Sequence, residues 1–190
     1  MSQATGIKGR LAPGILAGAI AGAVATWSIS FVIAMTELVL HFPIGTFYTI
    51  MGVSLGINVT TTAAYVAFGL HILTGTVLGM IVGLAVVRLK GILNTVKNVE
   101  IGIIAGVIIS LVLFIPVTLL LIEPSIRHIV SLLGSSANQT ALSNNINVFV
   151  SQVTASAVAF HILWGAIFGY MFSAMLRIRA YRLSHVGLNV

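Results

Sequence analysis

The chain contains no cysteine and no aspartate, and its only carboxylate side chains belong to Glu37, Glu100 and Glu123. Without thiols it forms no disulfide, has no thiolate nucleophile and holds no cysteine-ligated iron–sulfur cluster. Without aspartate, a Ser-His-Asp triad is excluded. The motifs HExxH, GxGxxG and GxxxxGK[ST] are also absent. These absences favour a protein that is not an enzyme.

Charge is scarce throughout the 190 residues. Only 6% of them are charged and 58% are hydrophobic, whereas a soluble domain carries about 25% charged residues. The net charge of +6 comes from basic residues that flank apolar segments, so we expect a lipid bilayer as partner and no nucleic acid. The sequence therefore predicts one all-α integral membrane domain over residues 1–190.

Four apolar segments reach the length of about 20 residues that a helix needs to cross a bilayer. Eight of the nine Lys and Arg residues fall on one side if both termini are cytoplasmic, and Arg127 is the exception. We therefore expect a multi-pass protein of the cell membrane, with an uncleaved first span favoured over a signal peptide. The predicted spans are Leu11–His41, Ala63–Arg88, Glu100–Ile122 and Val148–Arg177.

Two parts of the sequence occur twice. Residues 14–18 (GILAG) match 102–106 (GIIAG), and residues 71–75 (HILTG) match 161–165 (HILWG). This pattern predicts two tandem repeats, approximately 11–90 and 100–180. Each repeat crosses the membrane twice, so the repeats are expected to be parallel, with a pseudo-two-fold axis along the membrane normal.

Each half also contains a proline followed by a short amphipathic run. Pro43 and Pro124 precede apolar residues at spacings of one helical face, and proline suits the first turn of a helix. We expect a short outer helix in each half, lying in the interface or dipping in re-entrantly, with the interface favoured.

Other local signals lie in the second half and on the outer side. Pro116 is expected to kink the third span. The polar residues Ser135–Asn147 are expected to form an outer loop. Asn58 and Asn138 begin glycosylation sequons on the predicted outer face.

Small residues recur every four positions in each predicted span. On a helix this spacing leaves a bare ridge, and helices in lipid associate where small residues let their backbones approach. The predicted helix-packing residues are Gly14, Gly18, Gly22, Gly75, Gly79, Gly83, Gly102, Gly106, Ser110, Gly165, Gly169 and Ser173.

His71 and His161 are the leading candidates for chemistry, because each lies one turn before a glycine of the packing ridge. An ionisable residue inside a membrane is a functional hypothesis by default. Hydrogen bonding between helices is the favoured interpretation. A proton or metal role is an alternative, and axial ligation of one haem b is another.

A second candidate group lies at the outer end, where Glu37 and His41 are one turn apart and Glu123 lies near His128. Such carboxylate–imidazole pairs suit Zn or Cu. The favoured interpretation is that they mark the water interface. We therefore expect no cofactor and assign no metal, with haem b or Cu/Zn as alternatives.

Within the first span, Thr26 and Ser30 continue the glycine ridge towards Glu37. A packing role is favoured over the lining of a narrow pathway. Trp27 and Trp164 lie too deep for an interfacial belt, so we expect both to pack between helices.

The His-x3-Gly-x3-Gly helix, paired with a Gly-x-x-Ala-Gly helix and a proline-led short helix, resembles small prokaryotic membrane proteins of the YagU-like and related domain-of-unknown-function families. The matching residues are Ala17, Gly18, His71, Gly75, Gly79, Ala105, Gly106, His161, Gly165 and Gly169. The resemblance implies a four-helix architecture and no particular activity. The composition also resembles accessory subunits of archaeal membrane complexes such as ammonia monooxygenase.

Taken together, these features predict a non-enzymatic accessory or structural subunit that packs with other subunits into a larger membrane complex. A small transporter or channel that uses His71, His161 and Glu37 is the first alternative. A haem b electron carrier with two histidine ligands is the second.

Overall fold

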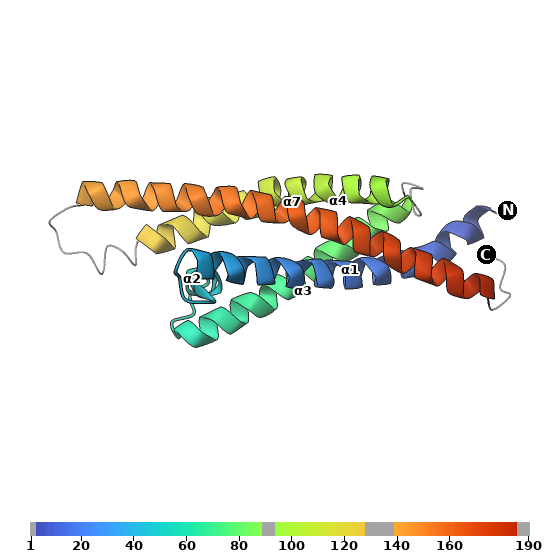
Figure 1. Cartoon of the computed structure of the whole chain (residues 1–190), viewed down its shortest axis with the longest axis horizontal. Helices are drawn as coiled ribbons and strands as arrows, with labels where there is room; N and C mark the ends of the chain where they lie inside the picture. The colour runs from blue at the N-terminus through green and yellow to red at the C-terminus, as the bar shows by residue number, and fades with distance from the viewer. Residues whose placement is uncertain (1–2, 89–93, 128–138, 186–190) are drawn as a thin grey trace. The chain divides into compact units, whose positions relative to one another are not determined.

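A computed structural model of the chain describes residues 3–88, 94–127 and 139–185, which are drawn in colour in Figure 1. The regular elements within these ranges are all helical. Four of the helices are long and apolar enough to cross a membrane, as predicted for a multi-pass membrane protein. Their spans are Leu11–Val39, Thr60–Arg88, Thr95–Arg127 and Ile146–Arg179.

The first helix, α1 (Gln3–Val39), ends in backbone hydrogen bonds of the Schellman type. The His41 N–H donates to the Leu38 carbonyl at 3.1 Å, and the Phe42 N–H donates to the Glu37 carbonyl at 2.8 Å. His41 takes a φ of 59°, the left-handed conformation that glycine usually supplies at this place. The position of His41 is thus explained by helix termination.

The short helix predicted after Pro43 is present as α2 (Thr46–Ser54). Gly45 precedes it with a φ of 91°, a conformation that favours glycine. A Cβ built on Gly52 would overlap the backbone of Ala63, so α2 rests directly on the first turn of α3 (Thr60–Arg88). The buried Tyr48 ring packs edge-on against Phe68, with centroids 5.4 Å apart.

The third span changes its helical pitch around Pro116. It runs through α4 (Thr95–Ile109), η1 (Ser110–Phe114), α5 (Ile115–Val117) and η2 (Thr118–Ile122), where η marks a π-helix. The Ile115 N–H donates to the Ser110 carbonyl, and the Glu123 N–H donates to the Thr118 carbonyl. Proline lacks an N–H and crowds the preceding turn, and here two wide turns flank it.

Pro124 does not begin a separate helix, because the span continues through it to Arg127. The remaining residues of the predicted second short helix lie outside the described ranges. Asn138 also lies outside them.

The last helix, α7 (Gln139–His185), is 47 residues long, so the prediction of a loop over Ser135–Asn147 is wrong from Gln139 onwards. Asn and Ser disfavour a helix by only a few tenths of a kcal/mol each. Adding residues to a helix that has already formed costs little free energy, because nucleation is the unfavourable step. At 1.5 Å per residue α7 rises about 70 Å, more than the ~30 Å hydrocarbon core.

The chain divides into two compact units, each with parts of several helices. Unit 1 comprises Met1–Ser30, His71–Gly106 and Ile162–Val190, and unit 2 comprises Phe31–Leu70 and Val107–His161. Each unit therefore draws on both predicted repeats, and the division does not follow the repeat boundary.

Glycines of α1 and α3 face one another in unit 1. A Cβ built on Gly18 would overlap the carbonyl oxygen of Gly79, and one on Gly22 would overlap that of Gly75. Backbone therefore touches backbone along this crossing, the arrangement that associates helices in lipid.

A second crossing in unit 1 brings α4 against α7. A Cβ on Gly102 would overlap the Gly165 carbonyl oxygen, and one on Gly169 would overlap that of Asn98. Along the same stretch of α7 the Trp164, Phe168 and Phe172 rings stack in sequence, with centroids 5.3 and 5.7 Å apart. Phe168 and Phe172 are fully buried and fill the interior of the unit.

The two crossings differ in register. In the first, a Cβ on Gly83 would lie 2.7 Å from the Gly14 carbonyl oxygen. In the repeat, Gly14 corresponds to Gly102 and Gly83 corresponds to Ser173, so the same register would bring Gly102 against Ser173. Gly102 instead lies against Gly165, two helical turns away along α7. The same small residues thus support two different alignments of a helix pair.

Candidate functional site

Glu37 joins α1 to the start of α2 in unit 2 through two hydrogen bonds. Its side chain is only 6% exposed. One carboxylate oxygen accepts the Gly45 N–H at 2.7 Å and the other accepts the Phe47 N–H at 2.6 Å. These donors belong to the first turn of α2, whose N–H groups have no partner within the helix. Gly45 has no side chain with which to cap them, so Glu37 supplies the cap from α1.

Glu37 also lines a pocket of about 260 Å³ in unit 2. Its walls come from the end of α1, from α2, from the end of the third span and from the unit 2 part of α7. The lining residues are Ile33, Thr36, Glu37, Leu40, Phe42, Thr46, Phe47, Ile50, Met51, Ile122, Ile126, Gln152, Val153, Ser156, Ala157 and Phe160. We call this the Glu37 pocket. Its wall is mainly apolar, with a few polar groups, as is usual for small-molecule sites.

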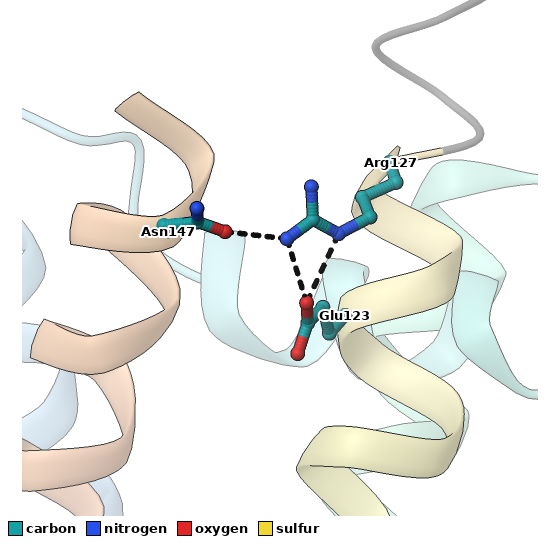
Figure 2. Close-up of polar contacts among 3 residues, drawn as sticks. All are labelled: Glu123, Arg127 and Asn147. Atoms are coloured by element: carbon teal, nitrogen blue, oxygen red, sulfur yellow. Dashed lines mark hydrogen bonds and ion pairs between the residues drawn. The ribbon is translucent and has the colours of Figure 1, made fainter. Parts of the chain in front are cut away.

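The partner of Glu123 is not a histidine. Figure 2 shows the Arg127 guanidinium donating to the Glu123 Oε1 through Nε at 3.0 Å and Nη2 at 2.7 Å. Nη2 also donates to the Asn147 Oδ1. The cluster ties the end of the third span to the first turns of α7. This partly exposed pair is four residues apart, and such pairs contribute only about 0.3–0.5 kcal/mol. The contacts of Arg127 therefore fix the position of these segments more than they stabilise them.

The described members of the outer carboxylate–imidazole group, for which a metal site was an alternative interpretation, thus have different surroundings. Glu37 caps α2, Glu123 pairs with Arg127, and His41 is exposed at the end of α1. His128 lies outside the described residues. Within the described ranges, no three His, Cys, Asp or Glu side chains come together in a way that suits a metal ion.

His161 is half-buried in unit 2, and its ring lies 5.3 Å from the Phe114 ring. Its Nδ1 lies 2.7 Å from the Ala157 carbonyl oxygen. A carbonyl only accepts, so Nδ1 carries the proton and Nε2 is left as the nitrogen that can accept a hydrogen bond or bind a metal. His71 is half-buried in unit 1.

Two polar contacts join helices in unit 1. The Trp164 indole N–H donates to the Thr26 Oγ1 at 2.9 Å, and Thr26 in turn donates to the Gly22 carbonyl at 2.7 Å. The Asn98 amide donates to the Ser173 Oγ at 2.7 Å, with both side chains buried. Trp164 therefore packs between helices as predicted.

The corresponding prediction for Trp27 is wrong, because its side chain is 57% exposed. A hundred degrees per residue places Trp27 on the face of α1 opposite the buried glycines. The predicted glycine ridge and the helical period together already place Trp27 on the uncovered side of α1, so the sequence contained the signal that the prediction overlooked.

Three polar contact partners were not predicted from the sequence: Asn98, Arg127 as the partner of Glu123, and Asn147. Asn98 lies four residues before Gly102, so the spacing of the small-residue ridge would have found it. Asn147 gave no such signal, because its partner is twenty positions away across a segment that sequence alone does not place.

The two π-helical segments each begin with a buried hydroxyl. Among the described residues, the Ser110 Oγ and the Thr118 Oγ1 have no hydrogen-bond partner. Serine and threonine in a regular helix often donate to the carbonyl four residues earlier, as Thr26 does. The wide turns thus coincide with the two buried hydroxyls that lack a partner.

Comparison with protein-family models, with curated proteins and with solved structures finds no match to the chain. Its function therefore has to be inferred from its own residues and their contacts.

Proposed function

We propose that the chain is a non-enzymatic membrane subunit that assembles with other membrane proteins. The observation that carries this proposal is a set of exposed apolar side chains on one face of α1. These side chains are between 43% and 65% exposed and share one helical face. They are Leu16, Ile20, Trp27, Phe31 and Leu38.

The two aromatic side chains favour a protein partner over lipid alone. Trp27 and Phe31 are 57% and 65% exposed and lie well inside the span Leu11–Val39. Tryptophan that faces lipid is enriched at the membrane surface, not at mid-depth. Large aromatic side chains dominate the energetics of protein interfaces. A partner helix over this face would bury them.

The inward polar groups support the same proposal, because they serve the chain's own packing. Thr26 receives Trp164, Asn98 meets Ser173, and Glu37 caps α2. Hydrogen bonds between membrane helices, such as the Thr26–Trp164 and Asn98–Ser173 contacts, contribute about 0.6 kcal/mol each on average, which is the scale of packing contacts.

The test is extraction of the tagged chain from its native membrane in gentle detergent, followed by native mass measurement. We expect a complex with other membrane subunits. Replacing Trp27 and Phe31 together by Ala should release the partner, while Leu120→Ala, at a side chain that is 73% exposed, should not. Recovery only as a monomer or homo-oligomer would reject the proposal, as would equal loss in the Leu120 variant.

A second function is favoured by the Glu37 pocket, which reaches the one buried carboxylate of the first span. In this proposal the chain is a small transporter, and the pocket is where its solute binds. Flux into proteoliposomes is the test, across several ions, solutes and pH values. Absence of flux in all of them rejects transport.

The proposal also includes the orientation of the chain in the membrane. We place both termini in the cytoplasm, supported by the basic residues near the chain ends and between the second and third spans. The short helix α2 then lies at the outer interface. The matches of 14–18 with 102–106 and of 71–75 with 161–165 support a tandem duplication, with a later shift in register.

A further inference from the structure

We propose that the Glu37 pocket binds a membrane-soluble amphiphile with a hydrogen-bond donor as its head group, either an alcohol or a protonated amine. The pocket lies entirely within unit 2. Its α1, third-span and α7 residues belong to segments that cross the membrane, so the ligand reaches it from lipid.

The volume of the pocket sets the size of the ligand. A methylene group is close in size to a water molecule, which occupies about 30 Å³ in the liquid. About 260 Å³ therefore accommodates an apolar body of roughly nine carbon atoms. Isoleucine, leucine, methionine and phenylalanine side chains make up most of the wall that such a body would contact.

Apolar contact alone does not make this pocket selective. An alkyl chain that moves from lipid into the protein leaves one apolar medium for another, so the hydrophobic effect gives it little. Selectivity must come from the polar groups of the lining. Besides Glu37 these are Thr36, Thr46, Gln152 and Ser156.

The charge of the lining decides which head group fits. Glu37 is the single charged residue among the pocket's lining residues, and Lys, Arg and His are absent from that lining. Each carboxylate oxygen has two lone pairs, and each accepts one backbone N–H from the start of α2. Glu37 can therefore accept a further donor, whereas an anionic head would meet a carboxylate with no compensating cation.

The experiment uses the full chain in phosphatidylcholine nanodiscs, labelled with ¹⁵N-phenylalanine. Phe42, Phe47 and Phe160 line the pocket, and the Phe47 amide itself donates to Glu37. Three probes with the same chain length are titrated: 1-nonanol, nonylamine and nonanoate. At about pH 8 the amine is protonated and the carboxylate is ionised.

We expect saturable shifts of the Phe47 and Phe160 amides with nonanol and nonylamine. A hydrogen bond to a charged group should lower their half-saturating ratio of probe to lipid at least about tenfold below that of nonanoate. Ser156→Trp should fill the pocket and abolish the saturable shift. Ala155→Trp, at the exposed neighbour that does not line the pocket, should leave it unchanged.

The head-group comparison is made on the unmodified chain, so it does not depend on the folding of a variant. The inference is overturned if no probe gives a saturable shift, if nonanoate binds as well as the other two, or if both tryptophan variants behave alike. It shares its pocket with the transport proposal. Saturable binding without flux would reject transport and leave this inference standing.

Discussion

Glu37→Gln offers the sharpest test of how the end of α1 is joined to α2. The two carboxylate oxygens accept the Gly45 and Phe47 N–H groups at 2.7 and 2.6 Å, with the side chain 6% exposed. Glutamine keeps one acceptor oxygen and turns an NH₂ donor towards the other N–H. One hydrogen bond to a charged group, worth about 1.5–3 kcal/mol, is therefore lost and a buried donor is left without a partner.

Amide hydrogen exchange measures this loss at the residues concerned. A local opening free energy lower by about 2–3 kcal/mol speeds exchange of the Gly45 or Phe47 amide by roughly 30- to 150-fold. Glu100→Gln, at an exposed glutamate of α4, is the matched control and should change neither rate. Unchanged exchange at both amides in the Glu37 variant would refute the capping role, and so would an equal effect of the Glu100 variant.

Three further predictions follow from single contacts. Gly79→Ala places a Cβ against the backbone of α1 and should lower the free energy of unfolding in detergent by about 2 kcal/mol or more. Gly69→Ala is the control: Gly69 has open space around it, so this variant should be neutral or stabilising by up to about 1 kcal/mol. Thr26→Val keeps the volume but leaves the buried Trp164 N–H without its acceptor, which should lower the free energy of unfolding by about 1–3 kcal/mol in the same denaturant titration. His41→Gly removes a side chain from a left-handed residue and should raise the free energy of unfolding by about 1 kcal/mol, and a lower value would contradict the Schellman assignment.

The spans could be predicted closely because a bilayer imposes their length and composition. Leu11–Val39 and Thr60–Arg88 differ from the predicted segments by only a few residues. The short helix after Pro43 could also be predicted, since proline and the apolar spacing are both local signals. These features depend on neighbours in the sequence and on the solvent, which composition reports well.

Contacts between distant residues could not be predicted in the same way. The carboxylate of Glu37 was a candidate ligand by its type, and its role as a cap depends on how the turn at His41 brings α2 back towards it. Pro116 predicts an irregular helix, but whether the helix bends or widens its turns depends on the packing around the proline. In both cases residue type indicates the importance of the position, and the fold decides the role.

The register of one helix against another was the feature that the sequence predicted least well. Glycine ridges predict that two helices approach, but a ridge with a four-residue spacing allows several alignments one turn apart. Gly102 lies against Gly165 although the repeat pairs it with Ser173. Asn98 distinguishes the alignments, because its amide reaches the Ser173 hydroxyl in the observed one.

Disulfide trapping in the native membrane tests the packing of these helices most directly, since the chain contains no cysteine of its own. The pair Asn98→Cys with Ser173→Cys joins two side chains that are in contact and should crosslink rapidly under mild oxidation. The pair Asn98→Cys with Arg177→Cys follows the register of the first crossing and should crosslink slowly or not at all. Preferential crosslinking of the Arg177 pair would contradict the packing of α4 against α7 described above.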